Sequence, residues 1–505
     1  MKRIGIIVLA AAIGIGSWTG VANAASSDPD SATDLLVQFA DASAIHSFSL
    51  VAQKNGSKME DLGGGHWVRM QFKNSELRGL KMQSLLADTR VLHVQPNYKI
   101  RLLEDYRIHD AKLKALVARA RTHAQKTGNS HLLGNPYPDN PAFAVKGPPT
   151  IGPDPKISSQ WGMLDIGIET AWKQSRGEGL IVAVIDSGID YTHEDLVDNL
   201  WRNSGEIGAD NEGRDKSTNG VDDDGNGFVD DLIGWDFVSN DNKPYDFAVN
   251  PIDLLGGGNP GHGTHCAGNV AAVADNAAGV TGVAPRAKIM GLRFISEKGT
   301  GDTAGAIQSI NYAVKMGAKI LSNSWGSEGE DPKEPETNKA LRDTITNAMN
   351  QGVLFVAAAG NGHLGVGYDN DTDPKPAYPA SYDIDNIVSV AALDKQDNLG
   401  AFSNWGKRSV DIGAPGVVVF STTIGGKYSD VVIDLPQFGI FVTWDGTSMA
   451  APHVAGAAAV YWAKHPNATW RDVKNALLNS VKPIPALADK SVSGGKLNVE
   501  KLMQP

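Results

Sequence analysis

Short apolar runs that alternate with helical segments, from about residue 157 onward, constrain the fold more than any other feature. Residues 304–317 and 338–352 are amphipathic and predict helices. The apolar runs predict buried strands at 181–186, 288–295, 319–326, 352–361 and 386–393. Fully apolar strands between helices indicate an α/β protein whose parallel sheet is covered on both faces. In such a sheet, a functional site lies beyond the carboxyl ends of the strands.

The region before this alternation is typical of a separate small α+β domain. Strands are expected at residues 35–39, 66–72 and 91–100, and a helix at 76–86. A basic helical stretch at 110–126 follows, and then a proline-rich segment that predicts a semi-extended linker. The chain is therefore expected to comprise a leader (1–24), a small domain (25–104), a helix with a linker (105–155) and a main domain (156–505).

The first 24 residues have the pattern of a secretory signal. A basic start is followed by an apolar run, and Ala22-Asn23-Ala24 is a small-x-small cleavage signal. The alternative is an uncleaved membrane anchor, which the short, interrupted apolar run disfavours. We expect a secreted, extracellular protein, with a periplasmic stage in transit and no membrane association after cleavage.

Composition excludes several classes of function. The formal net charge of −11 disfavours nucleic acid as a partner. A single cysteine, Cys266, excludes internal disulfides and zinc frameworks built on several cysteines.

Three short stretches place polar residues where the strand rule expects a site. Asp186 ends the apolar run IVAVID, where a buried carboxylate needs a partner. Ser448, in WDGTSMAAPHVAG, begins a helix of small residues and lies at the positive end of its dipole. GHGTHCAG (261–268) contains His262, His265 and Cys266. By itself this stretch fits a metal site, a thiol nucleophile, or a general base beside a packed thiol.

Taken together, these stretches resemble the subtilisin-like serine proteases. The matching motifs are VAVIDSGID, GHGTHCAG, SNSWG, AAAGN and GTSMAAPHVAG, and the resemblance covers residues 157–505. HGTHCAG is similar to the proteinase K and thermitase-like branches. The resemblance implies a subtilisin-like three-layer α/β/α fold with a mainly parallel sheet, preceded by a small α+β propeptide domain.

The resemblance also implies a role for each matching residue. Ser448 is expected to be the nucleophile, His262 the general base and Asp186 the residue that orients the imidazole. The Asn361 side chain and the Ser448 amide are expected to form the oxyanion hole. His265 is then structural, and Cys266 is buried and dispensable for catalysis. Activity should rise through the His262 pKa and stay high at mildly alkaline pH.

The implied specificity pocket is small and apolar. One wall is expected at Ser324, Trp325 and Gly326, and the other at Ala358, Ala359 and Gly360. Ala377 is expected near the floor. Because these stretches contain no charged residue, we expect a preference for bulky apolar or aromatic residues before the cut.

Two acidic stretches predict structural calcium (Ca²⁺) sites. In VDDDGNGFVDD, the spacing of Asp222, Asp224 and Asn226 matches an EF-hand loop, and Asp230 or Asp231 would close a shorter version. A solvated acidic turn is the alternative. The resemblance implies a second site at Asp195 and Asn276.

The region from about residue 34 to 101 resembles the inhibitory propeptide of secreted subtilases, with an independent binding domain as the alternative. Its cut site is expected between about Ile100 and the proline-rich linker. The predicted protein is a secreted, monomeric serine endopeptidase that acts on proteins and peptides, with its own propeptide as an intramolecular inhibitor. Two other functions stay open: a calcium-dependent binding protein without turnover, and a metallohydrolase using His262, His265 and Cys266.

Overall fold

The computed structural model describes residues 33–54, 57–104, 106, 111–126, 131–133, 151–328 and 338–504. The predicted signal peptide and most of the predicted linker lie outside the described residues. None of the described helices combines the length and the hydrophobicity needed to cross a bilayer.

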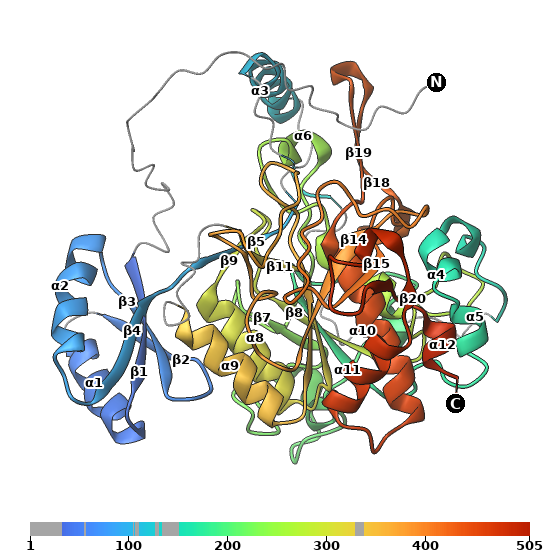
Figure 1. Ribbon diagram of the computed structural model, residues 1–505. Coiled ribbons are helices and arrows are strands. Elements are labelled where there is room, and N and C mark those ends of the chain that lie inside the picture. Colours follow the sequence, from blue (N-terminus) through green and yellow to red (C-terminus); the bar gives the residue numbers. More distant parts are fainter. Residues whose placement is uncertain are drawn as a thin grey trace.

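The larger domain is built on a nine-stranded sheet in the order β20-β21-β15-β14-β12-β10-β6-β8-β7 (Figure 1). Every neighbouring pair is parallel except β20 with β21. The strands are β6 (Ile181–Asp186), β7 (Gly234–Asp236), β8 (Lys288–Arg293), β10 (Ile320–Asn323), β12 (Leu354–Ala358), β14 (Ile387–Leu393), β15 (Ile412–Pro415), β20 (Lys482–Pro483) and β21 (Gly495–Lys496). The predicted parallel sheet is confirmed.

Helices cover both faces of this sheet. Along β6, Val182 and Val184 belong to the core that includes α7 (His262–Ala271) and α10 (Thr447–Lys464). Ala183 and Ile185 point the other way, toward α8 (Thr303–Lys315) and α9 (Lys339–Asn350). The alternation follows from the two-residue period of a strand. The predicted three-layer α/β/α fold is confirmed. Further helices of this domain are α4 (Trp161–Asp165), α5 (Ile168–Ala171), α11 (Trp470–Asn479) and α12 (Val499–Leu502).

Two of the predicted strands are each divided in the structure. The stretch expected at 319–326 breaks at Ser324, and β11 (Trp325–Glu328) leaves the main sheet. The stretch expected at 91–100 breaks after β4 (Val91–Pro96), and β5 (Lys99–Leu102) pairs elsewhere. Both detached strands join a small sheet in the order β13-β11-β5-β9, with β9 at Thr300–Asp302 and β13 at Ala377–Tyr378.

The N-terminal domain, residues 33–98, is an antiparallel sheet in the order β2-β3-β1-β4 with two helices on one face (Figure 1). Its elements are β1 (Asp34–Phe39), α1 (Ala42–Lys54), β2 (Lys58–Asp61), β3 (Trp67–Gln71), α2 (Ser75–Leu86) and β4. Helix α1 and strand β2 were not predicted from the sequence. Leu35, Val37 and Phe39 anchor a core that belongs to this domain alone.

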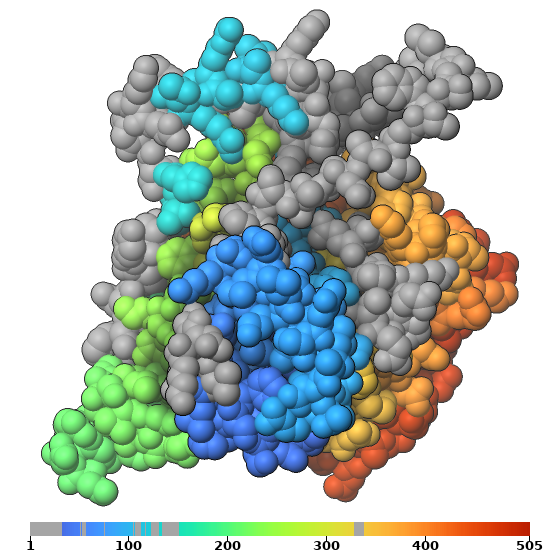
Figure 2. All heavy atoms as spheres, turned by 90° about the vertical axis from the view of Figure 1, so that its left-hand side faces the viewer, coloured from blue at the N-terminus to red at the C-terminus, as the bar shows by residue number. Residues whose placement is uncertain are grey.

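The N-terminal domain packs against α8 and α9 and lies in front of the larger domain in Figure 2. Asn311 donates through Nδ2 to the Leu62 carbonyl at 2.7 Å. The Trp67 indole donates to Asp343 at 3.2 Å. The interface therefore combines apolar packing with specific hydrogen bonds.

The same domain provides hydrogen-bond acceptors to the first turns of both helices. The Ala340 amide of α9 donates to Oε1 of Gln95 at 2.9 Å. The Ala304 amide of α8 donates to Oδ1 of Asn97 at 3.0 Å. Asn338, at the N-cap position of α9, makes no capping hydrogen bond with its own side chain. Gln95 thus satisfies an amide that the helix start leaves open.

The described segments that follow β5 pack on the larger domain. Helix α3 (Ala111–Lys126) confirms the predicted basic helix, and it lies beside α6 (Pro251–Leu254) (Figure 1). Its Leu113 packs in a cluster with α6 and the hairpin of β18 (Val431–Leu435) and β19 (Ile440–Thr443). Arg121 pairs with Asp253 at 3.1 Å. A second hairpin, β16 (Ser421–Thr423) with β17 (Lys427–Ser429), lies against α7.

Candidate active site

Asp186 and His262 meet at the carboxyl end of the sheet. Asp186 ends β6 and His262 begins α7, and Nδ1 of the imidazole lies 2.8 Å from Oδ1 of the carboxylate. The same oxygen accepts the Ser187 amide at 2.7 Å. Oδ1 of Asn259 accepts the His262 amide at 3.0 Å and so holds the start of the helix. Both partners are fully buried, which fixes the orientation of the ring.

The surroundings of His262 favour its charged form. Burial alone lowers the pKa of the imidazole, but the negative charges of Asp186 and Glu104 outweigh burial. The pKa of His262 therefore lies well above its ordinary value.

Ser448 occupies the first turn of α10, where Gly446 is the N-cap residue. Its hydroxyl donates to the Ser324 carbonyl at 3.1 Å, and no hydrogen bond joins it to His262 within the described part of the chain. Nε2 of His262 instead faces Oε2 of Glu104 at 3.2 Å. His262 and Ser448, which are expected to exchange a proton, therefore belong to the same site, but their side chains share no hydrogen bond in the described part of the chain.

Asn361 follows β12 and points its amide nitrogen into the site. Its Oδ1 accepts the amide of Thr447 at 2.9 Å and the hydroxyl of Thr447 at 2.8 Å. This leaves Nδ2 to donate to Oε1 of Glu104 at 3.0 Å. An amide donor fixed in this way suits the stabilisation of an oxyanion.

Strand β5 occupies the groove beside Ser448 as an extended peptide. It pairs antiparallel with β11 on one side and β9 on the other. Arg101 lies opposite Gly326 and Leu102 opposite Trp325. The Leu102 amide donates to the Gly299 carbonyl at 3.2 Å. These are main-chain contacts, which are independent of the side chains of the bound strand.

Gly326 and the core around Ala358, two parts of the predicted pocket, lie against Leu103. The side chain of Leu103 approaches Gly326, where an added Cβ would lie 3.2 Å from Cδ2. Leu103 also packs on the core that contains Ala358. Ala359 and Ala377 are bridged by Asn370, which donates to one carbonyl and accepts from the other amide. The remaining predicted pocket residues are Ser324, which lies between β10 and β11, and Gly360, which follows β12.

Trp325 contributes differently from the other predicted pocket residues. Its indole is fully buried and packs edge-on against Phe294 at 5.1 Å between ring centres. Only its backbone therefore faces the bound strand, through the pairing with Leu102.

The other two chemical groups of GHGTHCAG are buried and engaged. Nε2 of His265 lies 3.1 Å from the Val419 carbonyl, and its ring stacks on Trp444 at 4.2 Å. Burial lowers the pKa of His265 to about 3. Cys266 is 1% exposed, and burial raises the pKa of its thiol. Its Sγ lies 3.9 Å from Nδ1 of His262. The expected burial of both residues is confirmed.

In the acidic loop, the carboxylates that lie together only partly match the residues that were expected to bind calcium. Glu206, Asp224 and Asp231 place carboxylate oxygens within 4.8 Å of one another. Burial, with the neighbouring negative charges, raises the pKa of Glu206 to about 7 and that of Asp231 to about 6. Oε2 of Glu206 is buried and accepts no hydrogen bond from any described residue. Such a cluster fits the oxygen ligands of calcium.

The other predicted residues of this loop hold its turns. Asp222 accepts the amides of Asn226 and Gly227 at 3.0 and 2.7 Å. Asp230 accepts the Gly220 amide at 3.1 Å. The Asn226 amide group donates to Asp231 at 2.9 Å.

The residues expected to form a second calcium site lie together in the structure. Asn276 donates through Nδ2 to Oδ1 of Asp195 at 2.6 Å. Asp154 accepts the Asn276 amide at 3.3 Å, and burial raises its pKa to about 6. Burial likewise raises the pKa of Asp195. Two buried carboxylates and one amide therefore gather here, with Asp154 as the additional member.

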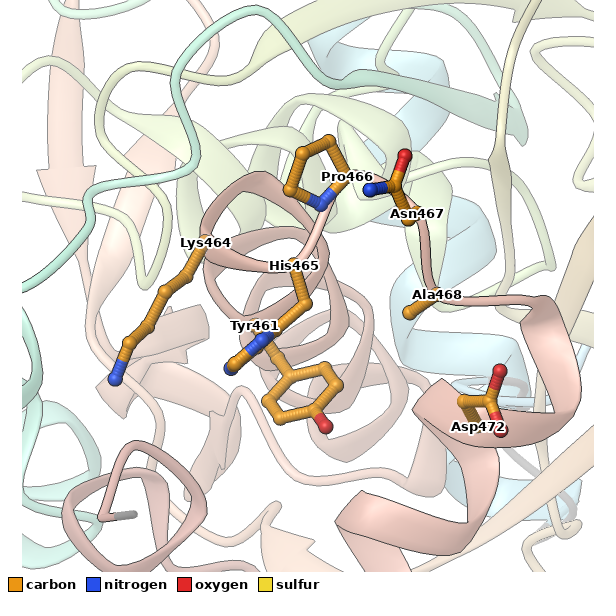
Figure 3. Close-up of a pocket in the computed structure, with 7 residues that line it drawn as sticks. All are labelled: Tyr461, Lys464, His465, Pro466, Asn467, Ala468 and Asp472. Carbon is orange, nitrogen blue, oxygen red and sulfur yellow. The ribbon is translucent and has the colours of Figure 1, made fainter.

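A separate hollow lies at the far end of α10 from Ser448, and Figure 3 shows its lining. It is lined by Tyr461, Lys464, His465, Pro466, Asn467, Ala468 and Asp472. It contains none of the residues predicted to act in catalysis.

Sequence reasoning missed several residues of these sites. Glu104 has no motif around it, and only its place after the 91–100 stretch gave a signal. Glu206 and Asp154 are remote in sequence from the acidic stretches that they complete. Asp246 accepts the Ser187 hydroxyl at 2.8 Å and the Thr264 hydroxyl at 2.7 Å, and so braces the loop beside Asp186.

The sequence matches a known protein family and several characterised relatives. The profile of the subtilase family (Peptidase_S8) matches residues 177–499. Thermitase of Thermoactinomyces vulgaris is 31% identical over 352 residues, which are 70% of this chain and 98% of thermitase. A thermophilic serine proteinase of Bacillus sp. (strain AK1) is 33% identical over 302 residues, 60% of this chain and 57% of that protein.

A solved structure supports the fold. The crystal structure of fervidolysin from Fervidobacterium pennivorans, described as a keratinolytic enzyme related to subtilisin, aligns with a TM-score of 0.61. The alignment covers 94% of this chain and 61% of that one, at 23% identity.

Proposed function

Because the chain belongs to the subtilase family of serine endopeptidases, we propose that it is a secreted enzyme that processes itself from a precursor. The observation that carries the proposal is the convergence of Asp186, His262, Ser448 and Asn361 at one end of the sheet, with the groove filled by the chain's own β5.

The proposed roles are those of a Ser-His-Asp triad. Ser448 attacks the peptide carbonyl while His262 takes its proton and then gives it to the leaving amine. Asp186, on Nδ1, holds the tautomer that leaves Nε2 free for the proton. Asn361 donates to the tetrahedral oxyanion, together with the Ser448 amide, and one such donor contributes about 10²- to 10³-fold to the rate.

The proposed substrates are proteins and peptides with a bulky apolar residue before the cut. Leu103, which lies against Gly326 and the core around Ala358, supports this preference because it is this kind of side chain. A peptide library should show leucine, phenylalanine and similar residues at this position. A strong preference for arginine or lysine would contradict the proposal.

The N-terminal domain is proposed to be the propeptide and intramolecular inhibitor. The test is Ser448→Ala, which should leave a full-length precursor after signal cleavage. Wild-type protein should lose the N-terminal domain, and a serine-directed sulfonyl fluoride should stop its casein hydrolysis. Processing of the Ser448→Ala precursor in the absence of other proteases would show that the chain does not cut itself.

Calcium is proposed to stabilise the enzyme and to take no part in the chemistry. Glu206, Asp224 and Asp231 would hold one ion, and Asp154, Asp195 and Asn276 a second. Calcium at 100 times its Kd would stabilise the fold by about 2.7 kcal/mol per site. EDTA should therefore lower Tm, and calcium but not zinc should restore it.

The matched variants are Glu206→Gln, inside the cluster, and Glu212→Gln, at an exposed position of the same loop. Glu206→Gln should reduce the calcium-dependent rise in Tm, while Glu212→Gln should keep it. An equal response of the two variants would contradict the site.

A further inference from the structure

Glu104 occupies the positions that a reacting peptide needs. Its Oε1 accepts the Asn361 amide at 3.0 Å, and its Oε2 lies 3.2 Å from Nε2 of His262. The side chain is 4% exposed, and Oε1 lies so close to Gly446 that an added Cβ there would clash. The carboxylate is thus enclosed between the oxyanion donor and the general base.

The Leu103–Glu104 bond lies near the start of α10, since Oε1 of Glu104 approaches Gly446, two residues before Ser448. Continued by one residue beyond the observed pair of Leu102 with Trp325, the antiparallel register would set Leu103 opposite Ser324. Ser324 is tied to Ser448 by two hydrogen bonds, since each hydroxyl donates to the other's carbonyl, at 2.9 and 3.1 Å. Leu103 also has the apolar side chain that the pocket accommodates.

We propose that Leu103–Glu104 is the bond cut in self-processing, and that the Glu104 carboxylate inhibits this cut until it leaves Asn361 and His262. The proposal rests on the proposed self-processing. In the cut, Ser448 Oγ bonds to the Leu103 carbonyl carbon as its proton passes to His262. The Leu103–Glu104 C–N bond breaks, and His262 gives the proton to the Glu104 amine. Water then hydrolyses the Leu103 ester and restores Ser448.

Two effects of the carboxylate slow this sequence. First, Glu104 occupies one of the two N–H groups of the Asn361 amide, and so competes with the Leu103 carbonyl oxygen for this donor. Second, the negative charge of Glu104 helps to keep His262 as the imidazolium, which cannot accept the serine proton. The inhibition is reversible because the side chain has rotatable bonds and need only swing away.

The experiment uses the full-length precursor, refolded from denaturant to start processing at a defined time. The first-order loss of precursor is followed for wild type, Glu104→Gln and Glu104→Ala. Both variants should process about tenfold faster or more, because a hydrogen bond to a charged group contributes at least that factor to an equilibrium. Mass spectrometry of the released fragment should show an end at Leu103.

Matched controls separate this effect from others. Glu76→Gln removes a carboxylate from an exposed position on α2, and its rate should equal that of wild type. Each Glu104 substitution is also made together with Ser448→Ala, to verify that the uncut precursor folds at the wild-type rate.

The outcomes are distinct. Unchanged or slower processing of folded Glu104→Gln and Glu104→Ala would overturn the inhibitory role. Equal acceleration by Glu76→Gln would do the same. A first fragment that ends elsewhere would overturn the assigned bond. Processing of Ser448→Ala would instead refute self-processing itself, whatever the Glu104 variants do.

Discussion

The two ring nitrogens of His262 face carboxylates from two different regions of the chain. Asp186, at Nδ1, belongs to the central sheet of the catalytic domain, and the adjacent Ser187 amide holds it in place. Glu104, at Nε2, belongs to the segment that leads out of the N-terminal domain, and it holds the Asn361 amide that the oxyanion needs. In the proposed mechanism, the same chemical group therefore assists catalysis from one side of His262 and opposes it from the other.

The largest effect that tests this comparison is expected from Asp186→Asn. An amide at this position favours the wrong tautomer of His262, so self-processing should slow by about 10⁴-fold. The rate is measured by precursor loss after refolding, over days. Glu104→Gln, the same chemical change on the opposite nitrogen, should act in the opposite direction. If both substitutions slowed processing, the two carboxylates would not differ as described.

A smaller effect is expected in pH dependence. Asp186 and Glu104 raise the His262 pKa, so the imidazolium persists to higher pH and the base form appears only above that pKa. In the proposed mature enzyme, β5 has left with the N-terminal domain and no longer fixes the position of Glu104. Precursor processing should therefore reach half its maximal rate at a higher pH than peptide hydrolysis by mature enzyme.

Rates measured across a pH series give both midpoints. Glu104→Gln should move the midpoint of precursor processing to lower pH, while Glu76→Gln should leave it unchanged. Coinciding midpoints for wild-type precursor and mature enzyme would mean that Glu104 does not affect His262.

The smallest effect is expected from Cys266→Ala. The thiol lies 3.9 Å from His262, but burial raises its pKa and keeps it neutral, unlike the two carboxylates. Peptide hydrolysis by the mature variant should stay within about threefold of wild type, a change below 1 kcal/mol in the barrier. A folded but inactive variant, verified by circular dichroism, would give the thiol a role in catalysis.

The catalytic domain was largely predictable from sequence because its signals are local. The apolar run 181–186 and strand β6 have the same bounds, and Asp186 was expected at its end. Short motifs marked His262, Ser448 and Asn361, since each lies next to the turn that orients it.

The features that were not predicted from the sequence depend on contacts between residues far apart in the chain. VLHVQPNYKI contains a breaker at Pro96-Asn97, where β4 ends, but it does not show that β5 pairs with β9 and β11 rather than with the sheet of β4. Glu104 acquires its contacts from the same pairing. Glu206 joins Asp224 and Asp231 across a turn of the acidic insert, a closure that no spacing rule encodes. Helix α1 was missed because serines and a histidine interrupt its apolar face.

Gln95 and Asn97 connect the proposed release of the N-terminal domain with the stability of the domain that remains. Their side chains accept hydrogen bonds from amides in the first turns of α9 and α8. Release of the N-terminal domain, as proposed, would remove both acceptors. A lost N-terminal cap typically costs about 1 kcal/mol of helix stability. If the N-terminal domain is released as proposed, the remaining domain would be less stable than it is inside the precursor, and an open groove would come at the expense of folding free energy.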